Sequence, residues 1–272
     1  MREVIRKVSK EFGISRDEAE QVVASLLEQP RFHICLHGSI DTAIQKKLER
    51  KLAQLKEDMP IEYVTKKAHF REYELHIEPG VFIPRPETEY FIDLIAQYSA
   101  ESPYRILEIG TGSGAIAIAL AHIFPTAFIV ATDISETALT CAHTNIKKLG
   151  LGARIALMRG DMFDALSGQF DMIISNPPYI PHSRLPALPA SVRSFEPLAA
   201  LDGGKNGIQF ITEIIEYGRD FLTHNGSMAI EIDEEQVDIL HKLLTKTLSK
   251  PFSFHKDLFN RFRYLLIGNI KK

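Results

Sequence analysis

From residue 104 onward, short apolar runs alternate with longer segments whose apolar positions repeat at helical spacing. The apolar runs predict strands over residues 105–109, 127–132, 155–158, 170–175 and 227–232, and a closing strand pair over 252–257 and 263–268. The intervening segments predict helices over residues 114–124, 135–149, 208–221 and 235–248. Alternating strands and helices are typical of a doubly wound, mostly parallel sheet, so we predict the α/β class.

The first part of the chain shows helical spacing and no strand pattern. Ser15 followed by Glu18 forms a capping box, which predicts a helix that continues to residue 29. Asp41 predicts the start of another helix, whose many charged positions indicate a solvated outer face. Pro60 predicts the end of the helical part. We therefore expect a small helical domain over residues 1–60.

The next segment is expected to be extended. Polar and apolar residues alternate over residues 73–77, so residues 61–82 are predicted to form an extended or hairpin linker. Three prolines then forbid regular structure over residues 79–86, which predicts an ordered loop before a helix at 87–97. The remaining residues, 83–272, are predicted to form the α/β domain.

Composition narrows the class of protein. The chain has 272 residues, of which 45% are hydrophobic and 25% charged, values that are ordinary for a globular protein with a sizeable core. Its net charge of −3 argues against a dedicated nucleic-acid binder. Only two cysteines occur, no apolar stretch approaches the roughly 20 residues of a membrane span, and no secretory signal is visible. We expect a cytoplasmic protein with no membrane partner.

The tetrapeptide Asn176-Pro177-Pro178-Tyr179 follows the strand predicted at 170–175. Two prolines cannot continue a strand ladder, so these residues lie at the carboxyl end of the strand, where open α/β sheets bind ligands. The Asn176 oxygen and the Pro177 carbonyl can accept both hydrogens of a flat amino group, and the Tyr179 ring can cover its face. The segment suggests methyl transfer onto an amide or amine nitrogen.

A glycine-rich turn follows the first predicted strand of the α/β domain. It contains Glu108, Gly110, Thr111, Gly112, Ser113 and Gly114. Glycines permit a tight turn and let a ligand approach the backbone. The spacing also fits a loose dinucleotide fingerprint, so the turn either binds a nucleotide-like cofactor or is only a tight turn.

Two acidic residues follow the next strands. Asp133 ends the second strand, where a carboxylate can accept from both ribose hydroxyls; the alternative is a helix-capping role before Ser135. Asp161 ends the third strand and could accept from an adenine amino group, with Met162 against the ring; the alternative is a turn aspartate. S-adenosylmethionine fits better than a nicotinamide cofactor, because Glu108 suits an ammonium group and Asn176–Tyr179 has no evident use in hydride transfer.

The chain resembles the HemK/PrmC-type protein-(glutamine-N5) methyltransferases, which act on peptide chain release factors. The resemblance rests on residues 79–89, 106–117, 175–180 and 195–204, and it covers nearly the whole chain. The Asn-Pro-Pro-Tyr segment is shared with adenine-N6 and other amino methyltransferases. The loop Ile83-Pro84-Arg85-Pro86-Glu87-Thr88-Glu89 is more specific to this family.

The resemblance implies a Rossmann-like methyltransferase domain behind a helical domain that holds the protein substrate. The methyl acceptor would be the glutamine of a Gly-Gly-Gln loop in a release factor. S-adenosylmethionine would be the cofactor, S-adenosylhomocysteine the product, and no metal would take part. The residues implied for the cofactor are Glu108, Gly110, Thr111, Gly112, Ser113, Gly114, Asp133, Asp161, Met162 and Asn176. The residues implied for catalysis and for the glutamine are Asn176, Pro177, Pro178 and Tyr179.

Three departures from the family pattern bear on substrate docking. Asp233 stands where glycine is frequent, Phe195 stands where tyrosine is common, and residues 65–69 lack an expected glycine. The alternative function is an N6-adenine or other amino-group methyltransferase acting on DNA or RNA, which the net charge and the helical domain disfavour. A catalytically silent binding module is a weaker alternative. His33, Cys35 and His37 alternate, but no second ligand pair at zinc spacing accompanies them.

Overall fold

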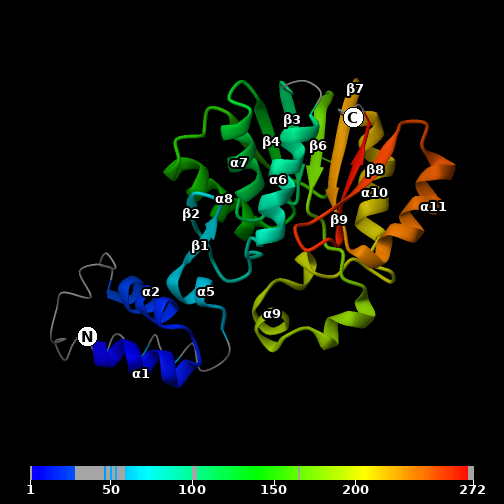
Figure 1. Ribbon diagram of the computed structural model, residues 1–272. Coiled ribbons are helices and arrows are strands. Elements are labelled where there is room, and N and C mark those ends of the chain that lie inside the picture. Colours follow the sequence, from blue (N-terminus) through cyan, green and yellow to red (C-terminus); the bar gives the residue numbers. More distant parts are fainter. Residues whose placement is uncertain are drawn as a thin grey trace.

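The computed structural model describes residues 2–27, 59–99, 103–164 and 166–268, together with the single positions 46, 50 and 53. Within these residues, seven strands form one sheet in the order β5-β4-β3-β6-β7-β9-β8 (Figure 1). Their bounds are β3 Arg105–Ile109, β4 Phe128–Asp133, β5 Ile155–Arg159, β6 Phe170–Ser175, β7 Leu222–Glu231, β8 Phe252–Lys256 and β9 Phe262–Ile267. The pairs from β5 to β7 are parallel, and β9 pairs antiparallel with both β7 and β8. This confirms the predicted doubly wound sheet and its closing strand pair.

The strand order reverses at the middle of the sheet. The chain runs from β3 outward to β4 and β5, and then returns to β6 on the other side of β3. In open α/β sheets such a reversal leaves a crevice at the carboxyl ends of the two central strands. The topology therefore places the ligand site where β3 and β6 end.

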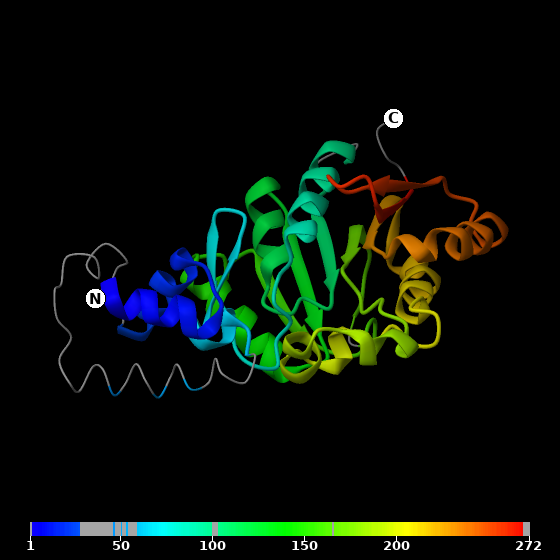
Figure 2. The same cartoon turned by 60° about the horizontal axis from the view of Figure 1, so that its bottom comes forward.

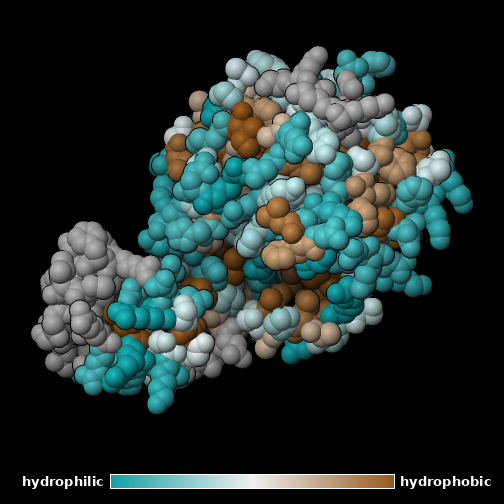
Figure 3. All heavy atoms as spheres, in the orientation of Figure 1, coloured by the Kyte–Doolittle hydropathy of each residue, from teal (hydrophilic) through white to brown (hydrophobic). Residues whose placement is uncertain are grey.

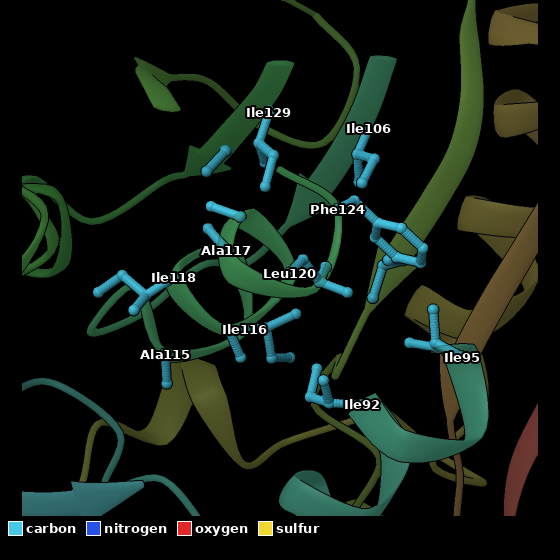
Figure 4. Packing of buried hydrophobic residues seen from close by; sticks show 14 of the residues in the cluster. Ile92, Ile95, Ile106, Ala115, Ile116, Ala117, Ile118, Leu120, Phe124 and Ile129 are labelled. Carbon is cyan, nitrogen blue, oxygen red and sulfur yellow. The ribbon is translucent and has the colours of Figure 1, made fainter. Parts of the chain in front are cut away.

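Two layers of helices cover the sheet (Figure 1). The cluster on one face contains α6 Pro86–Tyr98, α7 Ala115–Ile123 and α8 Glu136–Lys148, and the cluster on the other contains α10 Gln209–Gly218 and α11 Val237–Thr247. Ile106 belongs to the first cluster and its neighbour Leu107 to the second, because successive side chains of a strand point to opposite faces. Burial on both faces explains the continuous apolar runs in the sequence. Figure 4 shows side chains of α7 packed among those of α6 and the strands.

A segment with three short helices connects β6 to α10. Its helices are η1 His182–Ala187, α9 Ala190–Phe195 and η2 Leu198–Ala200. Two further 3-10 helices, η3 Arg219–Phe221 and η4 Glu234–Gln236, precede β7 and α11. The connecting segment lies below the carboxyl ends of the strands in Figure 1.

The first helices form a core of their own. They are α1 Arg2–Phe12 and α2 Arg16–Leu27, and their buried side chains pack with Val64. The predicted capping box is confirmed, since the Glu18 N–H donates to Ser15 Oγ at 3.2 Å and the Ser15 N–H donates to the Glu18 carboxylate at 2.6 Å. Figures 1 and 2 show both helices at one end of the molecule, away from the seven-stranded sheet. The helix predicted from Asp41 lies outside the described residues.

The linker between the two cores differs in part from its prediction. The hairpin of β1 Lys67–Phe70 and β2 Tyr73–His76 is confirmed. However, the helix α5 Ile61–Thr65 replaces the extended structure expected after Pro60. The Pro60 carbonyl accepts from the Tyr63 N–H at 3.1 Å, so this proline lies at the start of a helix. The end of the helical part predicted before Pro60 falls on residues 54–58, outside the described ranges.

The boundaries of β7 also differ from their prediction. The strand begins at Leu222, five residues before the predicted start at residue 227, because Leu222 pairs with Phe170 across an irregularity in the ladder. The exposed polar residues His224 and Asn225 hide this part of the strand from a search for apolar runs. Each described helix is too short or too polar to span a bilayer.

Candidate functional site

The carboxyl ends of β3 and β6 lie side by side. Ile109 pairs with Ser175, and the Ser175 hydroxyl donates to the Ile109 carbonyl at 2.8 Å. A cavity of about 660 Å³ opens at this edge, which is within the usual range for a small-molecule site. In Figure 3 apolar atoms surround a hollow between the segment that carries α9 and the sheet above it. The strand ends thus place the two predicted motifs at one cavity.

The glycine turn forms one wall of this cavity. Gly110 and Gly112 have φ of 74° and 57°, a left-handed conformation that favours glycine. The N–H groups of Gly110 and Thr111 both donate to the Thr132 carbonyl at 2.9 Å, which fixes the turn against β4. Gly110, Thr111, Gly112 and Ser113 line the cavity. Gly114 lies instead against α8, where an added Cβ would come within 3.2 Å of the Ala142 Cβ.

Glu108 lies beneath the turn and is not among the residues that line the cavity. One carboxylate oxygen accepts from the Thr111 hydroxyl at 2.8 Å, and the other has no hydrogen-bond partner among the described residues. Burial raises the pKa of the Glu108 carboxyl to about 8. The structure therefore gives Glu108 a role in holding Thr111, while its expected contact with a cofactor ammonium stays a prediction.

Asp133 accepts hydrogen bonds from the glycine turn and from the start of α8. One oxygen accepts from the Gly112 N–H at 2.8 Å, and the other accepts from the Ser135 N–H at 2.9 Å, at the start of α8. Burial raises the pKa of Asp133 above its usual value, against the lowering influence of these bonds. The residue also lines the cavity. It thus organises the glycine turn, while its contact with ribose hydroxyls stays a prediction.

The turn after β5 brings two predicted residues to the cavity. Asp161 and Met162 both line it. Met162 has φ of 46°, which is uncommon for a residue other than glycine and is often found at functional sites. Phe163 points into the core, where its ring stacks on Phe221 at 5.0 Å between centroids. Met162 is therefore the apolar side chain that this turn offers to a ligand.

The four residues Asn176, Pro177, Pro178 and Tyr179 all line the cavity. The Asn176 amide nitrogen donates to Thr88 Oγ1 at 3.1 Å, and this hydroxyl donates to the Glu231 carboxylate at 2.8 Å. The Tyr179 hydroxyl donates to the other Glu231 oxygen at 3.3 Å. Burial raises the pKa of Glu231 to about 7. A buried carboxylate thus anchors both ends of the tetrapeptide.

Gly203, Gly207 and Gln236 hold the backbone of Tyr179 in place. An added Cβ on Gly203 would come within 2.7 Å of the Tyr179 Cα, so only glycine fits there. The Gln236 side chain donates to the carbonyls of Tyr179 and Gly207, both at 2.8 Å. Asp233 completes a capping box with Gln236, accepting from the Glu235 N–H and donating its own N–H to the Gln236 side chain. Asp233, which stands where the family frequently has glycine, therefore fixes the position of the Gln236 side chain.

The other two departures also have structural explanations. Phe195 packs against the buried cluster that includes Tyr63, Val81 and Ile83, next to the linker hairpin. Lys66 has φ of 57° and ends α5 in the left-handed conformation. A glycine is natural at such a position, which fits the glycine that the family resemblance led us to expect within residues 65–69.

An ion pair joins the two loops that border the cavity. Arg85 pairs with Glu196, whose side chain is fully buried, and the Arg85 guanidinium lies 4.8 Å from the centre of the Phe82 ring. Phe82 and Arg85 line the cavity. The pair links residues 111 positions apart, so it couples the loop before α6 to the segment that carries α9.

Comparisons with known proteins agree with this geometry. A family model described as Methyltransferase small domain matches residues 72–187. A release factor glutamine methyltransferase of Gloeobacter violaceus is 40% identical over 195 residues, which are 71% of this chain and 68% of that protein. Another, from Moorella thermoacetica, is 38% identical over 82% of this chain and 81% of that protein. The chain belongs to the release factor glutamine methyltransferase family.

Solved structures place this family member in a known fold. A methyltransferase from Pyrococcus furiosus has a TM-score of 0.55 at 20% identity, covering 81% of this chain and 98% of that one. This similarity concerns the fold alone, and it confirms the predicted Rossmann-like architecture. Within the described ranges no group of three or more His, Cys, Asp or Glu side chains is arranged to hold a metal. His33, Cys35 and His37 lie outside those ranges, so the absence of a metal stays a prediction.

In this methyltransferase, two polar residues that were not predicted as part of the site contact the tetrapeptide. Thr88 lies in the first turn of α6, and Glu231 ends β7. Thr88 is part of the loop that carries the resemblance, but nothing in the sequence assigns it a contact with Asn176. A signal for Glu231 was present, because a glutamate that ends an apolar strand is expensive to bury without partners.

Proposed function

We propose that this protein transfers a methyl group from S-adenosylmethionine to the side-chain nitrogen, N5, of the glutamine in a Gly-Gly-Gln motif of a peptide chain release factor. S-adenosylhomocysteine would be the second product. The names of the relatives support a release factor as the substrate protein. The orientation of Asn176 carries the chemical part of the proposal, because its amide nitrogen is engaged by Thr88 while its oxygen has no donor among the described residues.

The residues of the cavity fit S-adenosylmethionine. When bound, this cofactor supplies a methyl group on a positively charged sulfur. The glycine turn leaves space beside the backbone, since an added Cβ on Gly110 or Gly112 would meet no atom within 4 Å. Asp133 would accept from ribose hydroxyls, and Met162 would lie against the adenine ring with Asp161 at its amino group. One oxygen of the buried Glu108 carboxyl has no hydrogen-bond partner among the described residues, so it can still accept a hydrogen bond beneath the turn.

The residues after β6 would hold the substrate amide. An amide nitrogen is a poor nucleophile, because its lone pair is delocalised into the carbonyl. The Asn176 oxygen and the Pro177 carbonyl would accept its two hydrogens, which directs the lone pair toward the methyl group and stabilises positive charge that develops on nitrogen. The Tyr179 ring would cover the amide plane. The methyl carbon would form a bond to nitrogen as its bond to sulfur breaks, with the electron pair left on sulfur, and the nitrogen would release one proton to water.

The helical part would dock the release factor. Its own core suggests an independent unit, and α5 belongs to that core through Val64. We therefore propose that the substrate-binding unit extends past the predicted boundary at residue 60 and includes α5. The hairpin after it joins the unit to the catalytic domain, because Asn145 on α8 accepts from the His76 N–H at 2.6 Å and donates to the His76 carbonyl at 2.9 Å.

The proposal is tested by methyl transfer from labelled S-adenosylmethionine. The acceptors are a purified release factor, the same factor with its Gly-Gly-Gln glutamine replaced by alanine, and a mixture of DNA and RNA. We expect label on the wild-type factor alone. Label on nucleic acid, or equal label on the alanine variant, would favour the amino-base alternative.

A further inference from the structure

The Asn176 amide is connected to a buried carboxylate through one hydroxyl group. We propose that Thr88 and Glu231 are positioning residues that turn the oxygen of the Asn176 amide toward the substrate. This inference rests on the proposed function and adds two residues to its machinery. The three side chains come from the end of β6, the first turn of α6 and the end of β7. Thr88 is 4% exposed and Glu231 is 1% exposed, so water does not compete for these bonds.

The direction of the hydrogen bonds follows from the chemistry of each group. A hydroxyl has one hydrogen, and at 2.8 Å from the Glu231 carboxylate the Thr88 hydroxyl gives it to that acceptor. Thr88 Oγ1 can then only accept from Asn176, which requires the amide nitrogen at this position. The Asn176 oxygen is left for the ligand. With the amide reversed, its NH2 group would face the NH2 group of the substrate glutamine, leaving donors without acceptors.

The charge on Glu231 is set by groups from several elements. Burial is the strongest influence and raises its pKa, and nearby Glu87 on α6 acts in the same direction. The hydrogen bonds from Thr88 and Tyr179 and the charge of Arg263 on β9 lower it, and the net pKa is about 7. The buried Tyr264 on β9 also faces it. Asp233, which follows β7, pairs with Arg263 at 3.2 Å and draws part of that positive charge away.

Protonation of Glu231 would disturb the chain of bonds. A neutral carboxyl has a hydrogen of its own, so it no longer requires hydrogens from both Thr88 and Tyr179. The Thr88 hydrogen is then free to turn toward Asn176, and the amide loses its enforced orientation. Turnover should therefore fall as the pH falls through about 7. Cofactor binding to the glycine turn should change little over the same range.

The test compares Thr88→Val, which removes the hydroxyl and keeps the shape, with Thr88→Ser, which keeps the hydroxyl. A third variant, Glu231→Gln, removes the titration. Thr223→Val is the matched control. Thr223 lies on β7 and donates to the carboxylate of Asp171 on β6, and neither residue lines the cavity. For each variant the measurements are kcat and KM with release factor, the Kd for S-adenosylmethionine, and the pH profile of kcat.

We expect Thr88→Val to lower kcat by roughly 10- to 100-fold, with Thr88→Ser and Thr223→Val within about threefold of the wild type. The Kd for the cofactor should stay within about twofold, and the acid limb of the pH profile of kcat near pH 7 should disappear in Glu231→Gln.

Wild-type kcat in Thr88→Val would overturn this inference and leave the proposed function standing. Loss of cofactor binding in Thr88→Val without rescue in Thr88→Ser would also overturn it, because that pattern indicates a structural role. A wild-type enzyme that leaves the release factor unlabelled would overturn the proposed function and, with it, this inference.

Discussion

Asn176 has the only side-chain amide in the tetrapeptide, so its donor and its acceptor are two separate atoms of one side chain at the cavity. Its donor is used within the protein, by Thr88, and its acceptor is left for the substrate. The Pro177 carbonyl lies next to it in the chain and cannot be altered by substitution without changing the backbone. The Asn176 side chain is therefore the most informative single group to remove.

We predict that Asn176→Ala lowers turnover with release factor by roughly 10²-fold or more, because one preorganised acceptor is lost. Asn225→Ala is the control, since Asn225 is an exposed asparagine on β7 that does not line the cavity. The measurement is the initial rate of methyl transfer at saturating cofactor. Near-normal turnover in Asn176→Ala would contradict the role assigned to this residue.

The sequence predicted the residues of this site better than their connections. The two prolines marked the end of β6, and the glycines marked the turn after β3, since both residue types have strong local conformational preferences. The bond from Thr88 to Glu231 spans 143 positions, and no local preference encodes it. Glu108 was placed at the cavity by its motif, but its side chain lies beneath the turn because alternate strand residues face opposite ways.

Elements were predicted well where burial imposes a pattern. β3 and β6 have their predicted bounds, because each is an apolar run with abrupt ends. The helix α5 was wrongly predicted as extended, since five residues are too few to show a helical period. Its C-terminal Lys66, with φ of 57°, is a conformationally unfavourable choice that sequence periodicity does not reveal.

This unfavourable conformation has a measurable cost. We predict that Lys66→Gly is more stable than Lys66→Ala by about 1 kcal/mol, because only alanine has a Cβ that opposes the left-handed conformation. Both variants lose the exposed pair between Lys66 and Glu78, so this loss cancels in the comparison. The measurement is urea unfolding of the two variants side by side. Equal stability, or a more stable alanine variant, would show that the end of α5 is not strained.

At the scale of the whole molecule, the Arg85–Glu196 pair connects the loop before α6 to the segment that carries α9. Glu196→Gln keeps the shape of the side chain and removes its charge. We predict a loss of about 1–2 kcal/mol in the free energy of unfolding, less than for a fully buried pair because about a third of the Arg85 side chain is exposed. Glu213→Gln, on α10, where the carboxylate accepts an exposed hydrogen bond from Gln209, should change it by less than about 0.5 kcal/mol. Denaturation curves that coincide for the two variants would contradict this coupling.

The fold brings several separated segments to one cavity at the reversal of strand order. The glycine turn follows β3, the tetrapeptide follows β6, and the loop before α6 and the segment with α9 close over them. The sequence could place the first two, because α/β topology assigns them to the same edge of the sheet. The closing segments were predicted only through a family resemblance, since their contacts are long-range.

The central claim is that one glutamine nitrogen of a release factor receives the methyl group. The most direct measurement is mass spectrometry of the release factor after incubation with the enzyme and S-adenosylmethionine, with fragmentation of the peptide that carries Gly-Gly-Gln. We expect one added methyl group on the side chain of that glutamine, and far less of it with the Asn176→Ala enzyme. A methyl group on any other residue, or an unmodified peptide with active wild-type enzyme, would contradict it.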